Sequence, residues 1–167
     1  STNGTDWASV GLAAPSTGAT LSSLSSGALS SGEYAIAYTV KRGGTAHESN
    51  GSSESTITIS GSTGAIHATA GTTSADPTVT AYVWYARHKT PDNESVLRKV
   101  SSGAASTVRI TSSAWTTNDE IPTNHDVPPA LAFGAVWKSR WWAKDGAVGN
   151  RLRFTELFQP QSWPSLY

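Results

Sequence analysis

Two segments in the first half of the chain alternate in a way that leaves few folds open. In residues 33–42 (EYAIAYTVKR) large apolar side chains occupy every second position, and in residues 78–89 (TVTAYVWYARHK) both sets of alternate positions are largely apolar. A period of two is typical of a β-strand, and a strand that is apolar on both sides is typical of a sheet covered on both faces. The sequence therefore predicts a layered all-β domain with these segments near its centre.

Shorter alternating segments, separated by turn signals rich in Gly, Pro, Asn and Asp, flank these two. We expect further strands at residues 19–24, 55–60, around 66, 95–102 and 107–112. Short strands with a turn every eight to twelve residues are typical of a β-sandwich. We predict an immunoglobulin-like or fibronectin-III-like sandwich over residues 18–117. Residues 1–17, small and hydroxylated, are expected to form an N-terminal arm that becomes ordered on a neighbour's surface.

Composition agrees with strands and turns and excludes several functional classes. Ser and Thr supply 46 of the 167 residues, whereas charged residues make up only 14%. A net charge of zero gives no electrostatic footprint for nucleic-acid binding, and no apolar run approaches the ~20 residues of a membrane helix. The chain has no Cys, which excludes disulfides and thiolate metal sites. We expect neither direct nucleic-acid binding nor membrane insertion, and a protein assembled in the cytoplasm rather than secreted.

The C-terminal quarter differs from the rest of the chain. Residues 118–129 carry three Pro and are predicted to form an extended linker, because Pro fixes φ and restricts the residue before it. Residues 130–167 hold all three Phe and four of the seven Trp, and they read as three short strands with a tight turn at Lys138–Ser139. An isolated ribbon of this size is marginally stable at best. We therefore expect this aromatic β-meander to dock on its own sandwich or on another subunit.

Charge is divided along the chain although its total is zero. Residues 1–129 carry a formal charge of −3, and residues 130–167 carry +3. This division favours head-to-tail contacts between copies, although salt screens exposed charges over about 8 Å.

The sequence offers little for catalysis. The four His are scattered, and only His125 adjoins an acid, Asp126. Zinc and calcium sites need three or more converging ligands, so a solvated turn is the favoured interpretation of this pair. No nucleophile elbow or ordered Ser, Asp and His series is present. We predict no catalytic residues, no metal and no cofactor, and hence not an enzyme.

The Trp cluster has two interpretations. Its rings could form a stacking platform for sugars, or they could be buried against a neighbouring subunit, where Trp and Arg are common anchors. Trp141 and Trp142 are adjacent on a predicted strand and must point to opposite faces, which favours burial on two sides over one flat platform. The residues predicted to form an assembly interface are Phe133, Trp137, Arg140, Trp141, Trp142, Arg151, Arg153, Phe154, Phe158 and Trp163.

Several stretches also resemble a known family. GEYAIAYTVKRGG followed by ESNGS, then SADPTVTAYVWYAR and WTTNDEIPTNHDVPPA, resemble the fibronectin-III-like domain of tail proteins from double-stranded DNA phages. The final segment, FGAVWKSRWWAKDGAVGNRLRFTELFQPQSWP, resembles the propeller-blade-like meander that follows this domain in the family. Lys138–Ser139 stands where the family has a Gly turn, and only one blade's worth of sequence is present, whereas a propeller needs about four or more blades.

The resemblance implies a virion structural protein without enzymatic activity. It would act in a tail, a head–tail connection or a decoration, with other copies of itself and other virion proteins as partners. Its location would be the virion, after assembly in the host bacterial cytoplasm. The alternative function is a carbohydrate-binding or adhesion module whose C-terminal Trp cluster binds a glycan.

Overall fold

The computed structural model describes residues 11–43, 47–71, 74–115, 117–125, 131–146 and 152–155. For the first three residues of strand β8 only the backbone is described. Every strand pairing among the described residues is antiparallel, and none of these residues forms a helix. The protein is therefore all-β, as predicted, and its described part contains no helix that could span a membrane. The strands are β1 Thr20–Leu29, β2 Gly32–Arg42, β3 Ser55–Ile59, β4 Gly64–Thr69, β5 Val79–Thr90, β6 Arg98–Gly103, β7 Thr107–Ile110, β8 Leu131–Trp137, β9 Arg140–Asp145 and β10 Leu152–Phe154.

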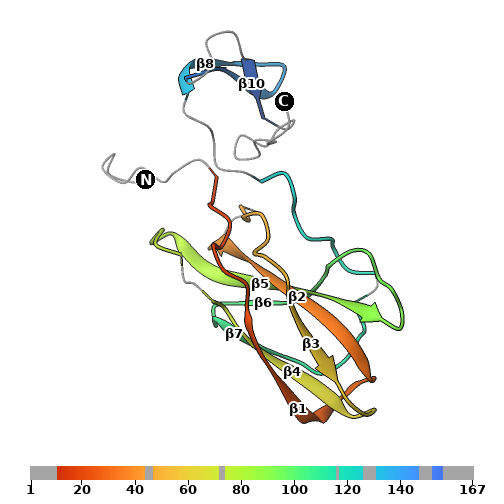
Figure 1. The fold of residues 1–167 in the computed structure, drawn as a ribbon. Coiled ribbons are helices and arrows are strands. Elements are labelled where there is room, and N and C mark those ends of the chain that lie inside the picture. Colours follow the sequence, from red (N-terminus) through yellow and green to blue (C-terminus); the bar gives the residue numbers. More distant parts are fainter. Residues whose placement is uncertain are drawn as a thin grey trace.

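The first seven strands form two sheets, which we call the two-sheet body (Figure 1). One sheet has the order β1-β4-β7, and the other has the order β3-β2-β5-β6. Strands β2 and β5, which contain the two segments with the strongest alternation, pair along almost their whole length, from Glu33 opposite Thr90 to Arg42 opposite Val79. Their predicted central place is confirmed, since each has a neighbour on both sides.

The main core lies between the two sheets. It takes large side chains from every second position of β2 and β5, and it adds residues from β1, β3, β4 and β7. Its largest members, all at most 4% exposed, are Leu12, Leu29, Tyr34, Ile36, Tyr38, Val40, Ile59, Ile66, Trp84, Ile110 and Trp115. A fully buried aliphatic or aromatic side chain contributes about 1.5–3 kcal/mol by leaving water, so this cluster is the principal source of the body's stability.

The outer face of the four-stranded sheet is also covered. Ala37, Val83 and Tyr85 point away from the main core and pack with Leu97 and the partly buried Ile121. This second cluster explains why β2 and β5 are apolar on both sides. It also means that residues after the last strand of the body take part in its packing.

Three parts of the body differ from the expectations. The strand expected to be short and weak around Ile66 is β4, which is the middle strand of its sheet and fully buries Ile66. The edge strand expected at residues 19–24 extends to Leu29. Leu12, within the predicted arm, is 3% exposed in the main core of its own chain. Residues 1–10 lie outside the described part of the chain.

The segment predicted to be a linker packs on the body as far as it is described. The backbone N–H of Lys99 donates to the carbonyl of Asp119, and that of Ile121 donates to the carbonyl of Leu97. An isolated bridge and an ion pair of 3.0 Å also join Arg98 to Glu120. Residues 117–121 therefore run along the edge of β6 as a partial extra strand. The rest of the predicted linker, residues 126–129, lies outside the described residues.

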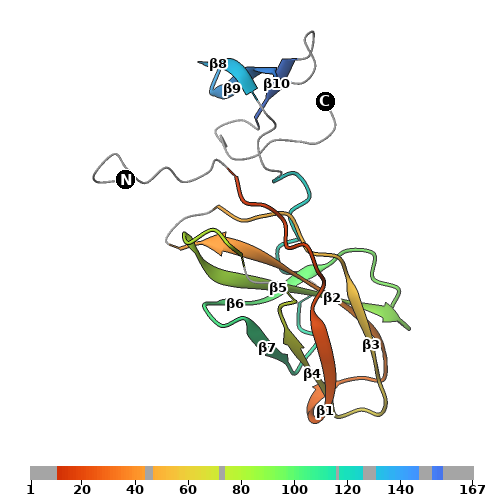
Figure 2. The same ribbon diagram turned by 60° about the vertical axis from the view of Figure 1, so that its left-hand side comes forward.

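Strands β8, β9 and β10 form a separate sheet, the C-terminal sheet, in the order β10-β9-β8. None of the strand pairs in extensive contact joins it to the two-sheet body. Figure 2 shows it beyond the end of the body, drawn in blue. The predicted three-stranded meander is thus present, and what covers it is the functional question.

Candidate binding surface on the C-terminal sheet

A two-residue hairpin turn sets the geometry of the C-terminal sheet. Trp137 pairs with Arg140, and Lys138 and Ser139 between them have φ values of 48° and 59°. Two consecutive positive φ values match the type I′ turn, whose twist suits a two-residue hairpin. Lys and Ser adopt this conformation at a cost, because a Cβ is disfavoured in the left-handed region.

The register of the three strands sorts their side chains into two faces. Residues directly opposite each other in antiparallel strands share a face, and the pairs are known for all three strands. We call one side the aromatic face; its described side chains are Ala135, Trp137, Arg140, Trp142, Lys144, Leu152 and Phe154. We call the other side the reverse face; its side chains are Val136, Trp141, Ala143, Asp145 and Arg153. Trp141 and Trp142 therefore point to opposite sides, as predicted.

Three rings are in contact along the aromatic face. The ring of Trp142 lies 5.8 Å from that of Trp137 and 4.7 Å from that of Phe154, measured between centroids. The indole N–H of Trp142 donates to the backbone carbonyl of Trp137 over 3.1 Å. Trp137 nevertheless remains 58% exposed, and Leu152 on the same face is 56% exposed. The row is ordered by its own contacts and still presents a large apolar surface to solvent.

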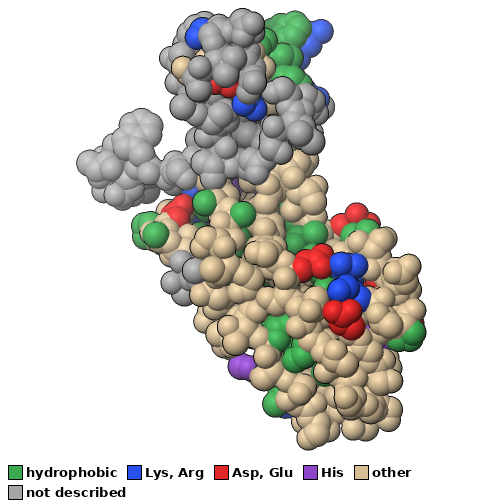
Figure 3. Space-filling model, in the orientation of Figure 1, with side chains coloured by type: hydrophobic (Ala, Val, Ile, Leu, Met, Phe, Trp, Pro, Cys, Tyr) green, Lys and Arg blue, Asp and Glu red, His purple; other side chains and the backbone are tan. Residues whose placement is uncertain are grey.

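Basic side chains lie against this row of rings. The Nζ of Lys138 is 4.6 Å from the centroid of the Trp137 ring, and the guanidinium carbon of Arg140 is 5.3 Å from that of Phe154. Arg140 also donates to the carbonyl of Thr155. Cation–π contacts of this kind contribute about 0.5–1 kcal/mol at exposed sites. Figure 3 shows this end of the molecule with hydrophobic side chains in green beside basic side chains in blue.

The reverse face is apolar and exposed at its hairpin end only. Val136 is 73% exposed and Trp141 is 38% exposed. The indole of Trp141 crosses Gly134, where an added Cβ would lie 2.5 Å from its Nε1. At the other end Arg153 donates to Asp145 over 3.1 Å, and the Asp145 side chain is 4% exposed. The described sheet thus has an apolar patch on each side.

The predicted interface residues divide into three groups. Trp137, Arg140, Trp142 and Phe154 meet on the aromatic face, whereas Trp141 and Arg153 lie on the reverse face. Phe133 belongs to β8, but its side chain is not described. The three others, Arg151, Phe158 and Trp163, lie outside the described residues. Arg153 is held by Asp145 of its own sheet, whereas the sequence had offered it as an anchor for a partner's acid. The interface itself stays a prediction.

Sequence reasoning missed a polar cluster on the body around Glu48. One carboxylate oxygen of Glu48 accepts hydrogen bonds from the hydroxyls of Thr39 and Tyr85, over 2.6 and 2.5 Å. Burial and the nearby carboxylate raise the pKa of Tyr85 far above its ordinary value. The spacing of Thr39, Glu48 and Tyr85 along the chain gives no signal for this cluster.

His125 closes the same region from the other side. Its ring Nδ1 donates to the carbonyl of Glu48 over 2.8 Å, and its backbone N–H donates to Oδ1 of Asn50 over 2.7 Å. The turn that the sequence suggested to be solvated is therefore tied to the body. No group of three or more His, Asp or Glu side chains able to hold a metal ion occurs among the described residues.

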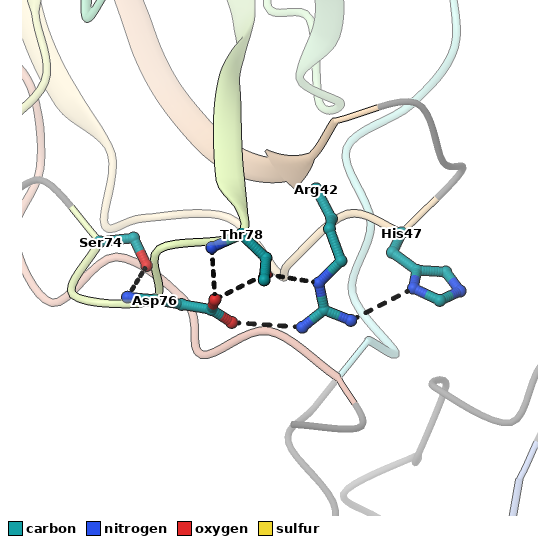
Figure 4. A network of polar contacts seen from close by, with 5 residues as sticks. All are labelled: Arg42, His47, Ser74, Asp76 and Thr78. Atoms are coloured by element: carbon teal, nitrogen blue, oxygen red, sulfur yellow. Dashed lines mark hydrogen bonds and ion pairs between the residues drawn. The ribbon is translucent and has the colours of Figure 1, made fainter. Parts of the chain in front are cut away.

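A second polar network ties the loop before β5 to the end of β2 (Figure 4). Arg42 donates to the hydroxyl of Thr78 and to the carboxylate of Asp76, and it lies 3.5 Å from Nδ1 of His47. Hydrogen bonds from Thr78 hold the pKa of Asp76 below its ordinary value. Burial, together with the charges of Arg42 and His125, lowers the pKa of His47. Every polar group here has a structural partner, which gives the network no evident chemistry to perform.

Comparison with known proteins adds no further constraint. No family model matches the chain, and neither curated proteins nor solved structures give a significant match. The function must therefore be argued from the geometry described above.

Proposed function

We propose that the protein is a structural component of a double-stranded DNA phage virion, in the tail, the head–tail connection or a decoration, and that it acts by multisubunit assembly through its C-terminal sheet. The observation that carries the proposal is the exposure of large apolar side chains on both faces of this sheet. Trp137 and Leu152 are more than half exposed on one face, as is Val136 on the other. Exposed apolar surface of this kind marks protein interaction sites.

The strand order of the body supports an immunoglobulin-like or fibronectin-III-like sandwich. With β1 and β4 taken as strands B and E, and β2, β5 and β6 as C, F and G, the neighbours are those of that fold, and β3 has the place of C′. Strand β7 departs from the scheme, because it pairs with β4 on the side of strand D but follows G in the sequence. The described residues form no strand in the place of A.

The geometry of the rings favours assembly over glycan binding. A sugar platform needs ring faces that lie side by side and open to solvent. The rings of Trp137 and Trp142 are inclined by 60°, and Trp142 is partly covered by Phe154. Trp141 lies on the opposite face and cannot extend the platform. A carbohydrate-binding or adhesion module stays the alternative, supported by the exposed face of Trp137.

The assembly role requires no catalytic residue, metal or cofactor, and we propose none. Partners would be other copies of the chain and other virion proteins, without direct contact to nucleic acid or membrane. The protein would be made in the host bacterial cytoplasm and reside in the virion.

The test is the native mass of the purified chain, measured by light scattering across a concentration series. We expect a defined oligomer or a mass that rises with concentration. Deletion of residues 130–167 should give a folded monomer, because the body keeps both of its apolar clusters, and Trp142→Ala should weaken assembly. If the deleted chain keeps the mass of the full chain, assembly does not depend on the C-terminal sheet. Binding of oligosaccharides by a strictly monomeric full chain would support the glycan alternative.

A further inference from the structure

The two apolar patches of the C-terminal sheet lie on opposite sides of a single layer of backbone. Leu152 is on the aromatic face and pairs with Lys144, whereas Val136 is on the reverse face and pairs with Trp141. Both are more than half exposed. A contact through one face alone therefore leaves the other patch in water.

Charge distinguishes the two faces. The described side chains of the aromatic face include the cations Arg140 and Lys144 and no acid, and Lys138 lies over the ring of Trp137 at its end. On the reverse face the charged side chains are Arg153 and Asp145, which neutralise each other in their ion pair. The aromatic face is thus positive, and the reverse face has no net charge.

This difference selects how two copies can meet. Packing aromatic face on aromatic face would bring Arg140 and Lys144 against their own copies, and like charges placed together across an interface disfavour association. Packing the aromatic face on the reverse face brings the cations against a neutral, apolar patch. The charge split along the chain, with +3 in residues 130–167, disfavours the first arrangement further.

We propose that the C-terminal sheets of successive copies stack head to tail, with the aromatic face of one copy on the reverse face of the next. This inference rests on the proposed assembly function and specifies its interface and its partner, a second copy of this chain. A head-to-tail contact is heterologous, so it generates a closed ring or an open filament rather than a two-fold dimer. Each sheet inside the assembly then has both apolar patches covered.

The test uses two full-length variants with the same added charge. Leu152→Lys places a cation on the aromatic face beside Lys144, and Val136→Lys places one on the reverse face. Both side chains are exposed, so neither substitution removes a buried contact. Ala104→Lys, on an exposed turn of the body, is the control for added charge. Native mass is measured for each variant alone and for an equimolar mixture of the two sheet variants, with Trp fluorescence as the check of folding.

Head-to-tail stacking predicts that each sheet variant alone is a monomer and that their mixture forms a 1:1 dimer. In this dimer the intact aromatic face of Val136→Lys contacts the intact reverse face of Leu152→Lys. The control should assemble as the unmodified chain does. If Val136→Lys alone still forms dimers, the contact is between like faces, and the inference fails while the assembly function stands. If the unmodified chain is monomeric at every concentration, self-assembly itself is overturned.

Discussion

The imidazole Nδ1 of His125 donates a hydrogen bond to the backbone carbonyl of Glu48, 77 residues earlier in the chain. The bond anchors the last described residue before the C-terminal sheet to the loop between β2 and β3. The neighbouring bond from the His125 N–H to Asn50 strengthens the same connection. The path between the body and the C-terminal sheet is therefore fixed at least as far as residue 125.

His125→Ala is expected to loosen this connection. Loss of a partly buried hydrogen bond costs about 1 kcal/mol, and the bond from the backbone to Asn50 can still form. Hydrogen exchange of residues 117–125 should become faster, and the free energy of unfolding should fall by about that amount. His67→Ala, at a half-buried position of β4, is the matched control. Equal exchange rates in the two variants would show that the His125 side chain does not hold the segment.

Tyr85 makes the protein sensitive to alkaline pH. Its pKa is raised in the folded chain by burial and by Glu48, whereas in the unfolded chain it ionises near the ordinary value of about 10. The unfolded state therefore loses its proton first, and stability present below pH 10 is lost as the pH rises above it. A single group of this kind contributes a slope of up to about 1.4 kcal/mol per pH unit.

Urea unfolding at pH 8, 10 and 11 measures this slope. Tyr85→Phe should be less stable than the unmodified chain at pH 8, because it lacks the bond to Glu48. Its stability should also fall less steeply above pH 10. Parallel curves for the two proteins would contradict the assignment to Tyr85.

His47 makes the opposite contribution on the acidic side. Its folded pKa is lowered, so the unfolded state takes up a proton first when the pH falls below about 6.5. Stability should therefore decrease between that pH and the lower folded pKa. Comparing melting temperatures at pH 7.5 and 5.5 tests this, and His47→Gln should show a smaller decrease because it does not titrate. An identical decrease would assign the acid sensitivity to other groups.

The hairpin turn of the C-terminal sheet can be improved by one substitution. Ser139 has a φ of 59°, a conformation that costs a residue with a Cβ about 1 kcal/mol and costs Gly almost nothing. Ser139→Gly should stabilise the β8–β9 hairpin by about that amount and slow the exchange of its amide protons. Gly61→Ala, at a φ of 89° in the body, is the matched variant of opposite sign and should destabilise. Faster exchange in Ser139→Gly would sink the argument.

The sequence predicts those parts of the fold whose pattern is local. Strands β2 and β5 carry their period of two within eleven or twelve residues, and the opposite orientation of Trp141 and Trp142 follows from the same rule. Strand β4 is harder to recognise, because Ile66 stands among small residues and its burial comes from pairing with β1 and β7. Turn residues such as Lys138 and Ser139 are found by position rather than by type.

The packing of residues 117–125 could not be predicted, because it rests on contacts with distant parts of the chain. The segment is polar and contains Pro122, which is typical of a linker. Its only large aliphatic side chain, Ile121, finds its place beside Leu97 and Tyr85 on the outer face of a sheet. The candidate binding surface was predicted more fully, since aromatic content and alternation both mark it, but the neutralisation of Arg153 by Asp145 depends on the register of β9 and β10.

The cover that Ile121 gives to the outer face of the four-stranded sheet bears on how such a protein can be recombined. A chain cut at residue 117 and joined to a different C-terminal part would leave Val83 and Leu97 exposed and the edge of β6 without its partner. A cut after residue 125 keeps the body intact and releases the C-terminal sheet whole. Exchange of the sheet between related genes, or its replacement by a designed assembly module, is therefore easiest in the short stretch between His125 and β8.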